Sequence, residues 1–76
     1  MPTIARLSRC VIRIYADDHP PPHFHIILND GRECLVAIET LRCIAGRVSH
    51  REIAEAIDWA AEQRPFLISR WKELNL

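Results

Sequence analysis

Histidine and aspartate residues are concentrated in one short segment of the chain, residues 17–25 (DDHPPPHFH). Prolines fix φ and bias the residue before each of them away from helix, so residues 17–22 are expected to form a stiff, extended connector. His23 and His25 follow this connector two residues apart, and in a strand such side chains point to the same side. Two imidazoles placed in this way can share one metal ion if a third ligand is close.

The third ligand could come from the connector. Asp17, Asp18 and His19 all carry groups that bind divalent metals, and the spacing permits each of them. Zinc is the ion that we consider, because imidazole and carboxylate are among its usual ligands.

The same cluster has two other interpretations. Histidine titrates near neutral pH, so His23 and His25 could act as an acid–base pair. Cleavage of RNA without a metal needs little more than such a pair and a cation to stabilise phosphate, which Arg13 could supply. Tyr15 is expected on the same face and completes the set of candidate catalytic residues. Alternatively, the imidazoles hydrogen-bond to the backbone of the connector and hold its turn.

Three β-strands are expected to position these side chains. Residues 10–16 are rich in β-branched residues, and residues 23–28 alternate between two faces. Residues 29–31 (NDG) tolerate the positive φ of a tight turn, so a third strand is expected at residues 32–39. A three-residue loop keeps one face of this hairpin apolar. It pairs Leu28 with Arg32, Ile26 with Cys34, Phe24 with Val36, His25 with Leu35 and His23 with Ala37.

The second half of the chain is expected to add a short strand and helices. Residues 40–46 favour a fourth strand that ends at Gly46. Ser49 and Glu52 form the pattern of a capping box before a helix at residues 50–63. Pro65 should then kink this helix or open a second one. Leu67, Trp71 and Leu74 recur at helical spacing in that last segment.

The predicted fold is α+β, with a three- or four-stranded antiparallel sheet followed by a C-terminal helix or kinked helical hairpin packed on one face. The face under the helices should carry Ile12, Ile14, Ile26, Leu28, Val36 and Ile38. That arrangement leaves His23 and His25 on the other face, beside Arg13 and Tyr15.

Length and composition indicate one globular domain, residues 1–76, with 49% hydrophobic and 26% charged residues. Ten basic and ten acidic residues cancel, which does not favour nucleic acid as a partner. No segment has the length of a signal peptide or a membrane span, so we expect a cytoplasmic protein. Cys10, Cys34 and Cys43 lack C-x-x-C spacing and are expected to be reduced, packed thiols. With only two glycines, the chain has no phosphate-binding loop.

Residues 18–25 (DHPPPHFH) resemble the D-H-x-P-P-H-F-H core of a family of small bacterial proteins, a domain of unknown function called DUF4160. The opening residues 1–4 (MPTI), the Ile14-Tyr15 pair, Trp59-Ala60 and Trp71 also resemble that family. The resemblance carries Asp18, His19, His23 and His25 over as the site, and we take these four as the candidate metal ligands. Residues 41–44 are more apolar than the family's turn.

The resemblance also implies a partner, because members of the family are typically encoded beside another small domain and some are labelled as toxin–antitoxin components. The leading expectation is therefore an interaction module of a two-gene, toxin–antitoxin-like pair. Its contact surface would be the histidine face or the helices that carry Trp59 and Trp71. The alternative is a metal-assisted or histidine acid–base hydrolase, with RNA as one substrate. The small domain and its histidine face also suggest a homodimer.

Overall fold

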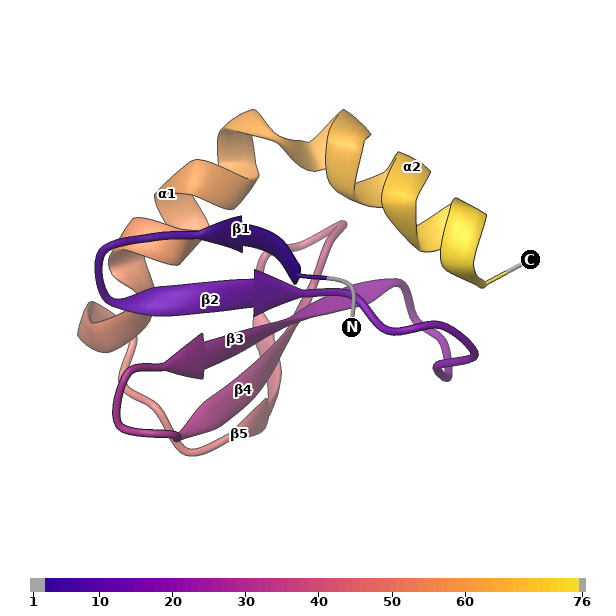
Figure 1. The fold of residues 1–76 in the computed structure, drawn as a ribbon. Helices are drawn as coiled ribbons and strands as arrows, with labels where there is room; N and C mark the ends of the chain where they lie inside the picture. The colour runs from indigo at the N-terminus through magenta and orange to yellow at the C-terminus, as the bar shows by residue number, and fades with distance from the viewer. Residues whose placement is uncertain (1–2, 76) are drawn as a thin grey trace.

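The computed structural model describes residues 3–75 and shows an antiparallel sheet with two helices across one of its faces (Figure 1). The strands lie in chain order in the sheet. They are β1 (Thr3–Arg6), β2 (Cys10–Arg13), β3 (His23–Leu28), β4 (Glu33–Ala37) and β5 (Cys43–Gly46). A 3₁₀ turn, Arg51–Ile53, leads into α1 (Ala54–Glu62), and α2 (Arg64–Leu74) follows. The predicted α+β class and antiparallel sheet are confirmed.

The sheet has five strands because the N-terminal residues form a strand that the sequence does not predict. β1 pairs antiparallel with β2, with Arg6 opposite Val11, and its register shifts between Thr3 and Ala5. The strand is four residues long and irregular, so it carries little alternation in its own sequence. β1 forms because its backbone pairs with the edge of β2, and this pairing cannot be read from the sequence of β1 itself.

The central hairpin has the predicted register. His23 lies opposite Ala37 and His25 opposite Leu35, so the two histidines share one side of β3. The loop closes through hydrogen bonds from the Leu28 amide to the Arg32 carbonyl (2.8 Å) and from the Gly31 amide to the Leu28 carbonyl (2.9 Å). Gly31 has a φ of 94°, as the turn requires.

The fourth predicted strand is confirmed over its second half, as β5. It ends at Gly46, whose φ is 112° and where a Cβ would lie 2.5 Å from the Glu33 carbonyl oxygen. All four residues of β5 are exposed. The prediction that all three cysteines are packed is therefore wrong for Cys43, since β5 is an edge strand that, within residues 3–75, pairs only with β4. Cys10 and Cys34 are buried, and all three thiols are free.

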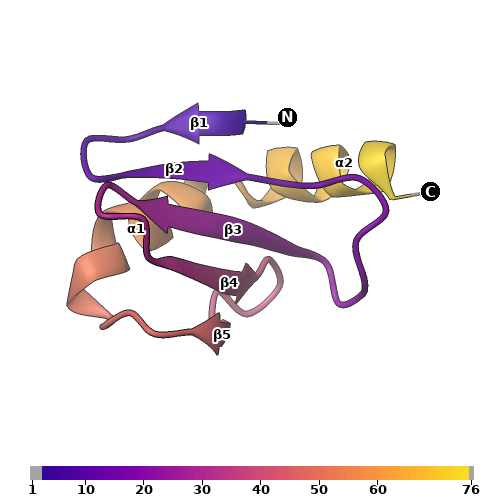
Figure 2. The same cartoon turned by 60° about the horizontal axis from the view of Figure 1, so that its bottom comes forward.

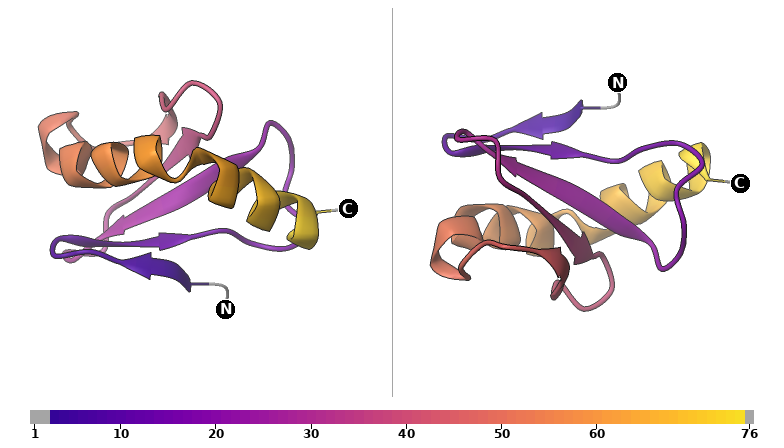
Figure 3. Two further views of the ribbon diagram at one scale, coloured as in Figure 1. Left: turned by 90° about the horizontal axis from the view of Figure 1, so that it is seen from above. Right: turned by 90° about the horizontal axis from the view of Figure 1, so that it is seen from below.

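The helices cover the predicted face of the sheet (Figure 3). The core below them holds nine of the largest side chains of the sheet and helices at 7% exposure or less, namely Ile12, Ile14, Phe24, Ile26, Leu28, Val36, Ile38, Leu67 and Trp71. All six residues predicted for this face are among them. In the part of the chain from residue 3 to residue 75, no helix is long and apolar enough to cross a membrane.

The helix start and the helix break follow the sequence signals. The Ser49 amide donates to Glu52 Oε1 (2.8 Å), and the Glu52 amide donates to Ser49 Oγ (3.2 Å), so the capping box forms. Hydrogen bonds from Arg32, followed by the Ser49 amide, lower the pKa of Glu52 to about 2. The first turn is 3₁₀, so α1 begins at Ala54 instead of residue 50. Pro65 lies in the first turn of α2 and separates the two helices.

Candidate metal centre

The link between β2 and β3 passes beyond the end of the sheet and lies beside the C-terminal end of α2 (Figures 1 and 2). The connector, residues 17–22, makes up most of this link. Asp17 has a φ of 56°, which turns the chain so that Asp18 faces back toward β3. The stiff connector thus delivers a carboxylate to the two histidines that follow it.

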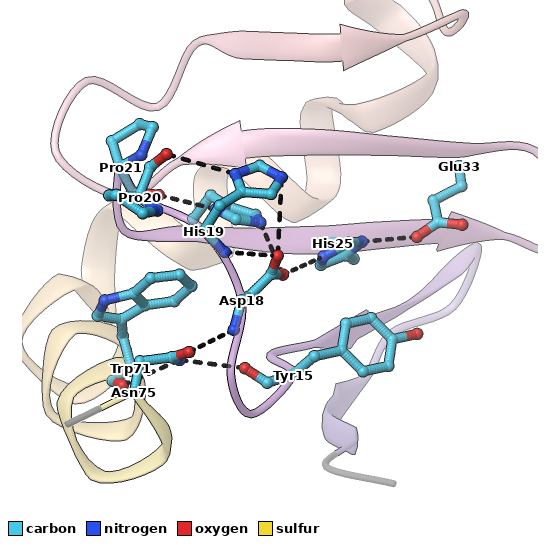
Figure 4. Close-up of polar contacts among 10 residues, drawn as sticks. Tyr15, Asp18, His19, Pro20, Pro21, His25, Glu33, Trp71 and Asn75 are labelled. Carbon is cyan, nitrogen blue, oxygen red and sulfur yellow. Dashed lines mark hydrogen bonds and ion pairs between the residues drawn. The ribbon is translucent and has the colours of Figure 1, made fainter.

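Asp18 contacts both His23 and His25, and Figure 4 shows its carboxylate facing the ring of His25. Its Oδ2 lies 3.0 Å from His23 Nε2 and 3.2 Å from His25 Nε2. Its Oδ1 accepts a hydrogen bond from the His19 amide at 2.9 Å. One oxygen of the carboxylate therefore contacts both imidazoles, while the other is held by the backbone of the connector.

The opposite nitrogen of each ring is held by an acceptor. His23 Nδ1 lies 2.7 Å from the Pro21 carbonyl oxygen, and His25 Nδ1 lies 2.6 Å from Glu33 Oε2. A carbonyl and an ionised carboxylate only accept, so the Nδ1 atom of each ring must carry a proton. In the neutral imidazole the Nε2 atom then carries a lone pair. This pattern, with the outer nitrogen donating to a carbonyl or carboxylate, is usual for histidines that bind a metal.

Three acceptor atoms consequently converge when both imidazoles are neutral: the two Nε2 atoms and Asp18 Oδ2. Asp18, His23 and His25 each offer one ligand atom, and these three atoms all lie within 4.8 Å of one another. Such a group is stabilised either by protons on both Nε2 atoms or by one cation among the three. A tetrahedral zinc ion with bonds of about 2.0–2.1 Å holds its ligand atoms about 3.3 Å apart. The two contacts to Oδ2 are within a few tenths of an ångström of this spacing, so the cluster could hold a metal ion.

The carboxyl of Asp18 is held in its ionised form. Desolvation raises its pKa, but the hydrogen bond from His25, the His19 amide and the charge and hydrogen bond of His23 together outweigh that effect. The pKa of Asp18 therefore lies below its usual value. An ionised carboxylate is the form that binds metal.

The environment of His23 differs from the expected exposed face. Its side chain is fully buried, with its ring centroid 5.0 Å from Trp71 of α2 and 5.2 Å from His19. Strand alternation does place His23 on the side of His25, but α2 extends past the end of β3 and covers this first residue. The expectation of an exposed face bearing both histidines is thus wrong for His23, whereas His25 keeps 12% of its side chain exposed.

His19 and Asp17 lie outside the cluster. The side chain of His19 is 71% exposed, and its Nε2 atom is 3.7 Å from Asp18 Oδ1. Its Nδ1 atom is 3.3 Å from the Pro20 carbonyl oxygen. Asp17 is exposed and donates its amide to the Leu74 carbonyl at 3.4 Å. Of the four candidate ligands, the structure brings Asp18, His23 and His25 together and leaves His19 at the rim.

The two other candidate catalytic residues lie beside His25, as predicted. Arg13 is its cross-strand neighbour in β2, and the Tyr15 ring meets the imidazole edge to face at 4.6 Å. Arg13 Nε is buried without a hydrogen-bond partner among residues 3–75. The cluster therefore has a cationic side chain on its flank that is not neutralised by an ion pair within the described chain.

Three contacting residues were missed by sequence reasoning: Glu33, Trp71 and Asn75. Glu33 could have been found, because the predicted register places it opposite Ile27, next to His25 on the same face. Trp71 and Asn75 come from the C-terminal end of α2 and its cap. The Asn75 side chain accepts a hydrogen bond from the Asp18 amide, 57 residues away in sequence. No local signal indicates that contact.

Comparison with known families identifies the chain. The family model described as "Domain of unknown function (DUF4160)" matches residues 10–72, which include the connector, both histidines and Trp71. No curated protein and no solved structure is significantly similar to the chain. Because the match spans most of the sequence, the chain belongs to the DUF4160 family, as residues 18–25 indicated.

Proposed function

We propose that this domain binds one divalent metal ion, with zinc as the best fit, through Asp18, His23 and His25. One observation supports the proposal above the others: both Nδ1 atoms face pure acceptors, so each ring, once neutral, keeps its lone pair on Nε2, and both Nε2 atoms lie within 3.2 Å of the same carboxylate oxygen. Two imidazoles and one carboxylate are a donor set suited to zinc and other first-row divalent ions.

The number of ligands suggests the chemistry. Structural zinc sites have four protein ligands, whereas catalytic sites have three and keep one position for water or substrate. A divalent ion held in this way supplies an activated water for hydrolysis. His25 and Asp18 retain 12% and 17% of their side-chain exposure, so a small molecule can approach from their side. We therefore propose metal-assisted hydrolysis, with Arg13 as the cation that favours an anionic substrate such as a phosphodiester of RNA.

The exposed His19 decides between an open and a closed site. If its ring rotates toward Asp18, it becomes a fourth ligand and the site is structural. We expect the open arrangement, because His19 Nδ1 contacts the Pro20 carbonyl and its Nε2 atom contacts Asp18 Oδ1 at 3.7 Å, whereas His23 and His25 share Asp18 Oδ2 at 3.0 and 3.2 Å.

A co-encoded protein partner and a homodimer stay predictions. The two surfaces expected for a partner receive less support than the metal centre, because Trp71 and His23 pack against each other inside the fold. Trp59 is half-buried against the core.

Zinc titration by calorimetry tests the proposal. Wild-type protein should bind one zinc ion and release protons, since the metal competes with protons for the Nε2 atoms. His25→Ala should abolish binding, whereas His50→Ala, which removes an exposed histidine far from the connector in sequence, should bind as wild type does. Equal binding by these two variants would refute the assigned ligands.

The catalytic part needs its own assay. Zinc-loaded and chelator-treated protein should be compared on single-stranded RNA and on a simple phosphodiester. Hydrolysis that requires zinc, survives His19→Ala and falls with Arg13→Gln supports an open catalytic site. Zinc binding without any hydrolysis, together with weaker binding in His19→Ala, would instead identify a closed structural site.

A further inference from the structure

Asn75, the residue that caps the C-terminal end of α2, holds the connector through its side chain (Figure 4). Its Oδ1 accepts the Asp18 amide at 2.6 Å. Its Nδ2 donates to the Tyr15 carbonyl at 3.1 Å and to the Trp71 carbonyl at 3.2 Å. The side-chain amide of Asn75 thus accepts a hydrogen bond from the connector and donates hydrogen bonds to Tyr15, just before the connector, and to Trp71 in α2.

The same turn also contacts the second part of the cluster. Trp71 lies one turn before Asn75 and packs on His23 with ring centroids 5.0 Å apart. Side chains four residues apart share one face of a helix. The end of α2 and its cap residue therefore contact two candidate ligands: Trp71 packs on the ring of His23, and Asn75 holds the backbone of Asp18.

The direction of the Asp18 carboxylate depends on this support. The amide of Asp18 is fixed by Asn75, and the residue before it adopts the left-handed region. Pairing of the Asp17 amide with the Leu74 carbonyl at 3.4 Å adds a second attachment to the helix end. Without the Asn75 side chain, the Asp18 amide loses its acceptor, and the turn is free to carry the carboxylate away from the imidazoles.

We propose that Asn75 is a positioning residue of the metal centre, which aims the Asp18 carboxylate at His23 and His25 by holding the connector against α2. This inference rests on the proposed metal site. Asn75 lies outside the matched family region, residues 10–72, and touches none of the ligand atoms itself. By holding Asp18 in place before the ion binds, Asn75 lowers the entropy cost of binding and so raises the affinity for the ion.

An asparagine suits this position for a specific reason. The Asp18 amide needs an acceptor, whereas the Tyr15 and Trp71 carbonyls need donors. Asn75→Asp keeps an acceptor but replaces the donor by a second oxygen, which faces two carbonyls. We therefore expect Asn75→Asp to resemble Asn75→Ala, even though its shape is conserved.

The experiment measures zinc affinity by calorimetry in the full chain for wild type, Asn75→Ala, Asn75→Asp and a control. Ile68→Ala is the control, because Ile68 is a half-buried residue of the same helix that packs on the core. Hydrogen exchange of the Asp18 amide is followed in the zinc-free proteins. Removal of an outer-shell partner typically weakens metal binding by about 10- to 100-fold, and we expect the lower end for both Asn75 variants.

The outcomes separate this inference from the metal site itself. Weaker zinc binding and faster Asp18 exchange in both Asn75 variants, with Ile68→Ala unchanged in both, support the positioning role. Wild-type affinity in Asn75→Ala overturns the role while the metal site stands, even if Asp18 exchanges faster. An equal loss of affinity in Ile68→Ala also overturns it, because general loosening of α2 would then explain the effect. Failure of the wild-type protein to bind zinc overturns both proposals.

Discussion

His23 and His25 should respond differently to removal in the metal-free protein, although both are ligands. His23 is fully buried, packs against the rings of Trp71 and His19, and contacts Asp18 and the Pro21 carbonyl. His23→Ala leaves a cavity beside Trp71 and removes the hydrogen bonds of the ring to Asp18 and to the Pro21 carbonyl, which together cost about 3 kcal/mol. His25 lies on the open face of the sheet, where water can replace its contacts, so His25→Ala should cost about 1 kcal/mol.

These magnitudes are large relative to the domain. A chain of this length has a free energy of unfolding on the order of 5 kcal/mol, and each kcal/mol shifts its melting temperature by about 4–8 °C. Thermal unfolding followed by circular dichroism in chelator should therefore show a drop of about 12–24 °C for His23→Ala and about 4–8 °C for His25→Ala. Equal shifts in the two variants would refute the burial argument, and zinc binding by either variant at wild-type affinity would refute the shared role.

Three further predictions test separate parts of the structure. Because the folded-state pKa of Asp18 lies below its unfolded value, its contribution to stability is present above about pH 3.9 and is lost as pH falls through the folded pKa. The stability gap between metal-free wild type and Asp18→Asn, measured by urea unfolding, should therefore narrow below about pH 4, and a constant gap would contradict the assignment. Gly31→Ala should cost on the order of 1–2 kcal/mol in the same assay, from its positive φ alone. Gly46→Ala should cost clearly more, since its Cβ also meets backbone 2.5 Å away, and equal costs would contradict the close approach of β4 and β5. In native protein one thiol, Cys43, should react quickly with a disulfide reagent, because burial raises the pKa of the other two; fast reaction of all three would contradict the core.

The hairpin that carries the histidines could be predicted because two local signals agree. The NDG loop allows a tight turn, and the apolar alternation on both sides accepts only one register. That register already places His25 beside Leu35 and near Glu33. The capping box at Ser49 and the break at Pro65 are equally local, and both are confirmed. β1 lacked such signals, since its pairing with β2 and not its own pattern makes it a strand.

The candidate site could be predicted only in part. Two imidazoles two residues apart on a strand must share a side, and this spacing identified His23 and His25. Spacing alone left Asp17, Asp18 and His19 open, and the family resemblance removed Asp17 but kept His19. The choice of Asp18 depends on the φ of 56° at Asp17 and on the Asn75 contact, which spacing does not reveal. Burial of His23 was also hidden, since alternation alone puts it on the open face, where the end of α2 and the connector cover it.

The most direct test of the central claim is a ¹⁵N spectrum of the imidazole rings, recorded as zinc is added to the metal-free protein. The structure predicts that both rings begin with a proton on Nδ1. At one equivalent of zinc the Nε2 signals of His23 and His25 should move together to the metal-bound region, while both Nδ1 atoms stay protonated and His50 does not change. Coordination through Nδ1, or unchanged Nε2 signals at one equivalent of zinc, would contradict the convergence of three acceptors on which the metal centre rests.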